Sequence, residues 1–412
     1  MAQSIAAVSI SRTFASLRHP NYRLWFIGQL FSLVGTWMQN TAQGYLIYEL
    51  TGSALYLGLV SFAAGVPTWL FTLYGGVIAD RIPRRNLLLI TQTSAMVLAF
   101  ILAALVLTGI VQPWMILILA FFLGTVNAFE APVRISFVRE LVADREDMPN
   151  AIALNATLFN AAATLGPAVG GLTYAAVGPG LCFILNGISF SAVLTALALM
   201  RIAVLPAPTQ RVSAVLQLKE GFAYVRSQPA ILYLMIGSAF LSICGFSLFA
   251  LMPAWAKDVL GGDATTNGLL NSARGLGSMV GALLIATLSY LKRRGRMWAL
   301  GSYAMPLFTL LFALMRELPL SLLMLFGFGL NLMMIANINN ALIQMEVPDE
   351  LRGRVMSIYT LVFQGGFPIG SLLAGAAAAQ IGEPTTIAIS AVLLLGFALF
   401  TSRYRPEIGR ME

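Results

Sequence analysis

Long apolar runs separated by short charged or Pro- and Gly-containing breaks dominate this sequence. Hydrophobic residues make up 58% of its 412 residues and charged residues only 10%, whereas about a quarter of the residues in a soluble domain are charged. A run of about 20 apolar residues is long enough for a helix that crosses a bilayer. The runs lack the alternation of a membrane β-barrel, so the sequence predicts an all-α membrane protein. Twelve transmembrane helices are expected near 23–48, 53–79, 87–108, 113–133, 150–176, 181–201, 230–256, 265–290, 297–315, 318–342, 355–381 and 384–403.

Positive charge is distributed unevenly along the chain. All but three of the 25 Lys and Arg residues fall in one set of alternate breaks; Lys257 and Arg316 lie in the other set, and Arg274 lies inside a run. Because cationic loops stay in the cytoplasm, we expect a multi-pass protein of the cytoplasmic (inner) membrane with both termini cytoplasmic. The net charge of +8 is spread over many membrane-edge loops, which argues against a nucleic-acid-binding surface.

The chain repeats itself at about half its length. The segment FASLRHP at 14–20 precedes the first run, and the related segment FAYVRSQP at 222–229 precedes the seventh. Two six-helix bundles in the same orientation are therefore predicted. Residues 5–18 and 213–226 are each interpreted as an amphipathic helix on the cytoplasmic face or as a solvated connector. The predicted boundaries are 1–22 for a cytoplasmic lead-in, 23–202 for the first bundle, 203–228 for a cytoplasmic linker, 229–404 for the second bundle and 405–412 for a cytoplasmic tail.

A glycine and four charged residues mark the break after the second run. The sequence GVIADRIPRR at 76–85 resembles the loop signature of the major facilitator superfamily, with Pro83 in place of the usual Gly. An Asp at the membrane edge can face the positive N-terminal end of another helix, and a Gly allows a helix to approach closely. The resemblance implies a clasp between the two bundles, while an ordinary positive-inside loop is the alternative. The residues of this conformational motif are Gly76, Asp80, Arg81, Arg84 and Arg85.

Small residues four positions apart follow in the fifth run. The sequence ATLGPAVGG at 163–171 resembles the antiporter signature of the same superfamily, which accompanies export. Small residues at this spacing permit close helix packing, and a proline allows a bend. Generic packing of a membrane helix is the alternative reading. The match is carried by Gly166, Pro167, Gly170 and Gly171.

Two further stretches narrow the resemblance. NAFEAPVR at 127–134 and WFIGQ at 25–29 are similar to the enterobactin-exporter and macrolide-efflux branch of the superfamily. This implies a major facilitator fold of two pseudo-symmetric six-helix bundles that exports a small amphipathic molecule, such as a drug or siderophore, by alternating access. A proton as coupling ion and a monomer without an obligate protein partner are also implied. That branch often carries Arg where this chain has Ala163, so charge-based recognition from the fifth helix is not expected.

Polar side chains inside the runs mark the candidate pathway, because each is costly in hydrocarbon unless it faces water or a partner. Asn127, Glu130 and Arg134 share one helical face at i, i+3 and i+7. Glu130 and Arg134 are charge-relay candidates, either as proton carriers or within a structural ion-pair network with Arg81 or Arg84. The candidates for the substrate cavity are Gln39, Asn40, Gln43, Asn127, Asn155, Asn160, Asn271, Arg274, Asn337, Asn340 and Gln364.

Arg274 stands about a third of the way into the eighth run. An Arg at a helix centre costs roughly 2.5 to 3.5 kcal/mol on insertion scales, so this side chain is not expected to face lipid. Three roles remain open: contact with the substrate or another anion, pairing with backbone carbonyls or Asn271, and snorkelling toward the membrane surface.

The sequence offers little material for a metal centre or an enzyme. His19 is the single histidine, and Cys182 and Cys244 lie in apolar runs, so no metal site or catalytic triad is expected. The phosphate-binding motif G-x-x-x-x-G-K-[ST] is absent. We therefore expect a transporter without a cofactor, with a small-molecule substrate and membrane lipids as partners. The first alternative is an uptake carrier or uniporter for a small nutrient or lipid-like molecule. The others are a membrane enzyme or lipid-handling protein and a non-transporting partner or sensor.

Overall fold

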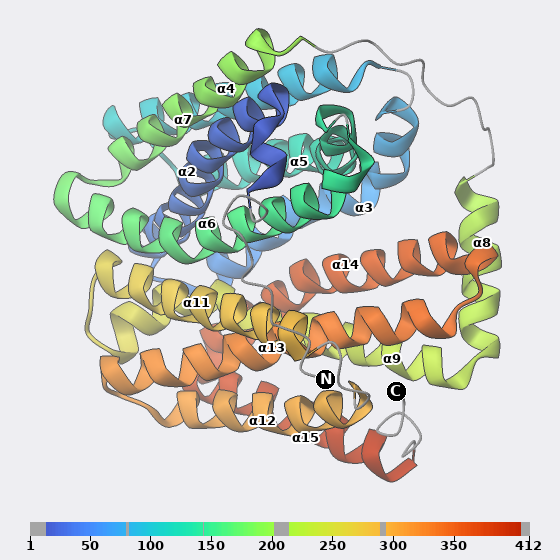
Figure 1. The fold of residues 1–412 in the computed structure, drawn as a ribbon. Helices are drawn as coiled ribbons and strands as arrows, with labels where there is room; N and C mark the ends of the chain where they lie inside the picture. The colour runs from blue at the N-terminus through green and yellow to red at the C-terminus, as the bar shows by residue number, and fades with distance from the viewer. Residues whose placement is uncertain (1–13, 80–81, 143, 202–213, 289–293, 405–412) are drawn as a thin grey trace, which may run out of the picture.

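The computed structural model describes residues 14–79, 82–142, 144–201, 214–288 and 294–404, without the side chains of 72–79, 214–218, 286 and 288. Every regular element in these ranges is helical, which confirms the predicted all-α class (Figure 1). The first half contains η1 (Ala15–Arg18), α2 (Pro20–Thr51), α3 (Ala54–Ala79), α4 (Arg84–Leu107), α5 (Pro113–Leu141), η2 (Arg145–Asp147), α6 (Met148–Val177) and α7 (Pro179–Leu199). The second half contains α8 (Ala214–Ser227), α9 (Pro229–Phe240), η3 (Leu241–Gly245), η4 (Phe246–Leu251), α10 (Met252–Ala254), η5 (Trp255–Val259), α11 (Ala264–Leu288), α12 (Arg294–Leu314), α13 (Leu318–Glu346), α14 (Asp349–Ile381) and α15 (Glu383–Tyr404).

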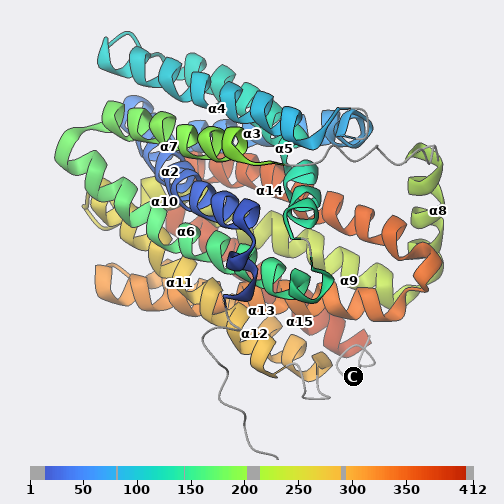
Figure 2. The same ribbon diagram turned by 45° about the horizontal axis from the view of Figure 1, so that its top comes forward.

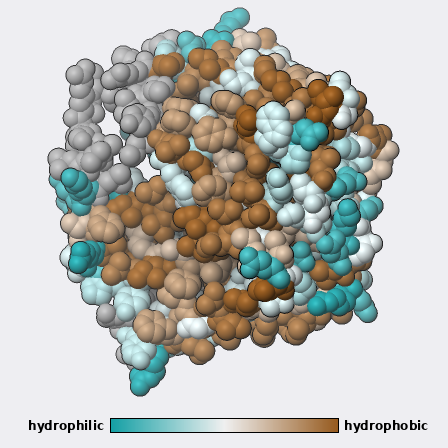
Figure 3. All heavy atoms as spheres, turned by 180° about the vertical axis from the view of Figure 1, so that it is seen from behind, coloured by the Kyte–Doolittle hydropathy of each residue, from teal (hydrophilic) through white to brown (hydrophobic). Residues whose placement is uncertain are grey.

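The exterior fits a lipid environment. Within the described part of the chain, eleven helical segments are long and apolar enough to cross a membrane. The exception among the twelve expected spans is α2, whose length suffices but whose sequence includes Gln29, Gln39, Asn40 and Gln43. Figure 3 shows hydrophobic side chains over the middle of the face in view, with hydrophilic ones toward its left and right edges. The molecule is a multi-pass membrane protein.

Two faces of the molecule can be told apart by their connections. At the turn face, five of the connections between spans contain a glycine with φ between 59° and 84°, a region where a side chain would be strained. These residues are Gly52, Gly109, Gly178, Gly261 and Gly382. The opposite face carries the connections α3–α4, α5–α6 and α13–α14 together with most of the described Lys and Arg residues, and we call it the basic face. The turn face is at the left of Figure 1 and the basic face at the right.

Helix packing in the first half is repeated in the second. In the first half α2 packs on α6 and α7, α3 on α5, and α4 on α5 and α7. In the second half the seventh span (α9 to η5) packs on α14 and α15, α11 on α13, and α12 on α13 and α15. Each helix pair of the first half thus corresponds to the pair at the same positions in the order of the second half, as expected for two pseudo-symmetric bundles.

The halves meet through two helix pairs, α6 with α11 and α3 with α14. Glycines allow the halves to approach closely from the middle of the spans to the turn face. Toward the turn face, a Cβ on Gly171 would lie 2.4 Å from the carbonyl oxygen of Ala264, and one on Gly375 would lie 2.6 Å from that of Ala54. At the same face Tyr48 of α2 donates a hydrogen bond to Asp258 of η5. The two halves are therefore closed against each other at the turn face.

The seventh span is not a continuous α-helix, which differs from the expectation of a plain helix at 230–256. After α9 the backbone passes through a π-helical turn, a 3₁₀ segment, a short α segment and a second π-helical turn. Gly245 and Pro253 lie in this stretch, and both residue types weaken a regular helix. Such irregular membrane helices are tolerated where they are buried in protein or line a cavity.

A short segment before each half docks onto that half's fifth helix. Next to α6, Arg18 donates to the carboxylates of Asp144 and Asp147 at 2.8 Å each, and His19 lies 2.9 Å from Asp147. Arg18 thus neutralises a group of carboxylates that could otherwise attract a metal ion. Glu220 of α8 pairs with Arg354 of α14 at 2.6 Å, and Figure 2 shows α8 beside α9 and α14. The amphipathic helix expected at 213–226 is α8, whereas most of the one expected at 5–18 lies outside the described residues.

Candidate functional site

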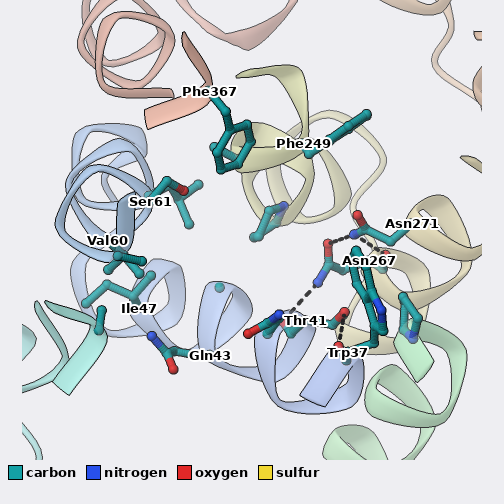
Figure 4. Close-up of a pocket in the computed structure, with 18 of the residues that line it drawn as sticks. Trp37, Thr41, Gln43, Ile47, Val60, Ser61, Phe249, Asn267, Asn271 and Phe367 are labelled. Carbon is teal, nitrogen blue, oxygen red and sulfur yellow. Dashed lines mark hydrogen bonds between the residues drawn. The ribbon is translucent and has the colours of Figure 1, made fainter. Parts of the chain in front are cut away.

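A cavity of about 440 Å³ lies between the two halves, from the middle of the spans toward the turn face. The first half lines it from α2, α3, α5 and α6, and the second half lines it from η4, α10, α11 and α14. Its volume falls within the range of about 300 to 1,000 Å³ that is usual for small-molecule sites. Figure 4 shows side chains from both halves pointing into the same space.

One wall of the cavity is aromatic and another is polar. Trp37, Phe246, Phe249 and Phe367 supply the aromatic surface, and three of the four are labelled in Figure 4. The broken seventh span contributes Phe246 and Phe249, so its irregular backbone shapes this wall directly. The polar wall is formed by Asn40, Thr41, Gln43, Ser61, Asn127, Asn267 and Asn271.

Hydrogen bonds fix part of the polar wall across the boundary between the halves. The Asn267 side chain donates to the Thr41 carbonyl oxygen at 3.4 Å, which joins α11 to α2. The Asn271 side chain donates to the Asn267 carbonyl oxygen at 3.0 Å (Figure 4). These bonds use amide donors of the wall, and Arg274, one turn further along α11, adds a charged donor to it.

Arg274 lines the cavity and is 8% exposed. Its guanidinium carbon lies 3.8 Å from the centre of the Phe249 ring, a cation–π distance. Its Nε atom is buried without a hydrogen-bond partner. Within the described part of the chain, no acidic side chain lines this cavity.

A second, smaller cavity of about 70 Å³ lies inside the first half. Glu130 is buried there, with an oxygen 3.9 Å from the Arg134 guanidinium. The amide atoms Gln29 Nε2 and Gln92 Oε1, on residues that line the same cavity, are buried without a partner. Asn40 and Asn127 line both cavities, so a polar boundary separates Glu130 from the central cavity.

The loop motif after α3 is only partly described. Asp80 and Arg81 lie outside the described residues, and Gly76 is described as backbone within α3. Arg84 pairs with Glu140 of α5, and Arg85 donates to the carbonyl oxygens of Leu197 at 2.7 Å and Ala198 at 3.1 Å. Glu130 therefore pairs with Arg134 and not with Arg84, while the alternative network through Arg81 lies outside the described residues. The physical reason is that α5 continues through Pro132 to Leu141, which places Glu130 about 15 Å along the helix from Glu140 and its partner.

The small residues of the antiporter motif face two different neighbours. A Cβ on Gly166 would lie 2.9 Å from the Val34 carbonyl oxygen, and one on Gly170 would lie 2.8 Å from that of Met38, both on α2. Gly171 faces α11 instead, and the Pro167 carbonyl oxygen lies 2.5 Å from the position of a Cβ on Gly268. The motif thus packs α6 against its own half and against the other half at once.

Residues 11–410 match a family model described as transmembrane secretion effector. The chain belongs to this family of the major facilitator superfamily. It is a membrane transporter and not an enzyme. The match spans nearly the whole chain, so the residues of both halves and of both cavities lie inside the matched range.

Similar proteins agree with the family assignment, and similar solved structures agree with the fold of this transporter. It is 25% identical to the staphyloferrin A transporter of Staphylococcus aureus, over 90% of this chain and 92% of that one. It is also 25% identical to the enterobactin exporter EntS of Shigella boydii, over 92% and 91% of the two chains. Among solved structures, the nucleoside transporter NupG has a TM-score of 0.74 at 16% identity, covering 94% of this chain and 99% of that one. A bacterial homologue of the human lysosomal transporter Spinster, in an inward-facing and occupied conformation, gives 0.71 at 12% identity and 95% and 98% coverage.

The structure brings some of the transporter's predicted cavity residues together and leaves others apart. Asn40, Gln43, Asn127, Asn271 and Arg274 line the central cavity. Gln39 lines the smaller cavity, where its Oε1 accepts a hydrogen bond from Asn186 at 2.7 Å. The residues that line neither of these two cavities are Asn155, Asn160, Asn337, Asn340 and Gln364.

Local partners account for two of the residues left apart. Asn160 donates to the Ala156 carbonyl oxygen, and Asn340 accepts from Gln344 at 2.5 Å near the basic face. The neighbouring Asn339 is buried and donates to Ser238 at 2.7 Å. Sequence reasoning missed Asn267 and the aromatic wall of the seventh span; Gly245 and Pro253 were the available signal for the break.

Proposed function

We propose that this chain is a secondary active exporter that carries a small amphipathic molecule, such as a siderophore or a drug, out of the cytoplasm by alternating access. The observation that carries the proposal is the central cavity, which both halves line and which their turn-face contacts close on one side. The relatives named as staphyloferrin A transporter and enterobactin exporter support a siderophore-type substrate.

The distribution of charge supplies the proposed orientation. Lys and Arg are concentrated at the basic face, so that face and both termini are cytoplasmic, in the inner membrane. The turn face is then external, and the described conformation is closed to the outside. The opposite state requires the α6–α11 and α3–α14 contacts to separate and equivalent contacts to form at the basic face.

Proton antiport is proposed through Glu130. A carboxylate is the simplest proton carrier within a span, and this one is buried in a polar cavity with room for ordered water. In support, Asn40 and Asn127 line both the smaller cavity that holds Glu130 and the central cavity. Protonation of Glu130 would remove its ion pair with Arg134, and the loss of this ion pair would change how α5 packs.

Transport into everted inner-membrane vesicles tests the proposal. Vesicles that contain the protein are energised and offered radiolabelled enterobactin, staphyloferrin A, a macrolide and a lipophilic cation, with and without a protonophore. We expect one or more of these compounds to accumulate and the accumulation to collapse when the protonophore is added. Vesicles without the protein provide the baseline.

The alternatives give different results in the same experiment. Accumulation that ignores the protonophore would remove proton antiport. Accumulation by intact cells but not by everted vesicles would identify an uptake carrier. If the Glu130→Gln variant still transports and its transport still depends on the proton gradient, Glu130 is not the proton carrier.

A further inference from the structure

The positive charge of Arg274 has no counterion in the described part of the molecule. No ion pair or hydrogen bond to its guanidinium is formed by the described residues, and its Nε atom is buried without a partner. An arginine side chain remains charged at physiological pH. A buried charge without a partner is costly, and such residues in membrane helices mark functional sites.

The backbone around Arg274 holds it at the cavity and not at a membrane surface. It stands on α11 in line with Asn267 and Asn271 at i, i+4 and i+7, so all three line the cavity from one helical face. The Phe249 ring lies under the guanidinium at 3.8 Å. This ring replaces some of the lost hydration but supplies no negative charge.

The remaining cavity wall has no competing charge. Every other described side chain that lines the cavity is neutral, so the site carries a single positive pole. The aromatic rings of Trp37, Phe246 and Phe367 line the same cavity. A charge at one end and aromatic rings along the body are complementary to an anion that carries an apolar, ring-containing group.

We infer that the central cavity selects organic anions: a carboxylate or ionised phenolic group binds Arg274, and an apolar, ring-containing body packs against Phe249, Phe246 and Trp37. The inference rests on the proposed function for its transport role, but anion binding itself requires no transport. It disfavours cationic drugs, because they would place a second positive charge beside Arg274. Export of such an anion in exchange for a proton moves charge in the direction that an inside-negative potential favours.

Binding to the purified, full-length protein in nanodiscs tests the inference. The probes are 1-pyrenebutyrate, its neutral primary amide and the cationic 1-pyrenebutylamine, which share one apolar body. Energy transfer from tryptophan to pyrene reports binding, since Trp37 lines the cavity. We expect the carboxylate to bind about 10- to 100-fold more tightly than the amide, the gain of a charge-assisted hydrogen bond, and the amine to bind most weakly.

Variants separate the charge of Arg274 from its packing. Arg274→Gln is expected to bring the affinity for the carboxylate down to that for the amide, with the amide unchanged, whereas Arg274→Lys keeps part of the preference. Asn271→Asp supplies an internal carboxylate three residues away and is expected to abolish the preference without removing the arginine. Lys257→Gln, at the exposed turn face, is the matched loss of one positive charge and should change nothing.

Thermal stability distinguishes a binding role from a structural one. Because an unpaired buried charge is unfavourable, Arg274→Gln should leave the melting temperature unchanged or raise it. A lower melting temperature with equal loss of all three probes would overturn the inference, as would a wild-type protein that binds the carboxylate and the amide equally. If the protein in nanodiscs prefers the carboxylate but the vesicles show no transport, the proposed function is refuted and the inferred anion site stands.

Discussion

Placing a methyl group on Gly171 tests how the two halves close. In Gly171→Ala the new Cβ would lie 2.4 Å from the Ala264 carbonyl oxygen and 3.0 Å from the Thr265 Cα. Ordinary C···O contacts begin near 3.3 Å, so α6 and α11 must separate by about 1 Å. Overpacking of this kind costs about 1 to 3 kcal/mol, and only the state closed at the turn face bears that cost. The equilibrium should therefore shift about 5- to 150-fold toward the state open at the turn face.

Spin-label distances across the turn face measure this shift. Labels at Val177 and Glu317, in a background with Cys182 and Cys244 replaced by Ala, report on one exposed position in each half. Gly170→Ala is a matched control, because its Cβ meets Met38 within the same half and should lower stability without moving the distances. Gly396→Ala meets no neighbour and should alter neither quantity. A folded Gly171→Ala protein with an unchanged distance distribution would refute the reasoning.

Three further predictions concern other parts of the molecule. Glu130→Gln should retain substrate binding in nanodiscs yet abolish substrate-driven proton movement in proteoliposomes, measured with an internal pH dye. Tyr48→Phe removes a hydrogen bond between the halves and should favour the open turn face by about fivefold in spin-label distances, a modest effect because Asp258 is exposed. Asp263 caps the N-terminus of α11 by accepting a hydrogen bond from the backbone N–H of Thr266, and this bond holds the pKa of Asp263 below its usual value. The cap therefore stabilises the fold above about pH 4, and this stabilisation is lost as the pH falls through the lowered pKa. Asp263→Ala should cost about 1 kcal/mol at pH 7, and less in acid, in denaturant unfolding.

The sequence was a good guide to the spans because hydrophobicity and proline fix helix positions in lipid. Predicted starts near 113 and 318 match α5 and α13 to the residue. The predicted fourth span ended at 133, where the apolar run stops, but α5 continues through Pro132 to Leu141. The break in the seventh span could not be placed because π and 3₁₀ turns depend on packing against α14, for example through the bond from Ser242 to the Phe363 carbonyl oxygen.

The candidate site was predicted in part, and helix rotation explains the difference. Each residue turns a helix by about 100°, so a polar side chain one position away faces a different neighbour. Asn340 and Asn339 on α13 illustrate this, since the first bonds to Gln344 and the second is buried against Ser238. A charged residue within a span is easier to place: the cost of Arg274 in lipid excludes a lipid-facing position, and the side chain lines the cavity, one of the positions that the sequence left open.

A reversible cross-link at the turn face tests most directly whether transport requires the halves to part there. Tyr48→Cys and Asp258→Cys place one thiol on each half where these side chains now meet, and a short, reducible bifunctional thiol reagent joins them. Transport into everted vesicles should stop when the link is made and return when it is reduced, while each single-cysteine variant keeps working in the presence of the reagent. Undiminished transport by the fully cross-linked protein would contradict alternating access through this cavity.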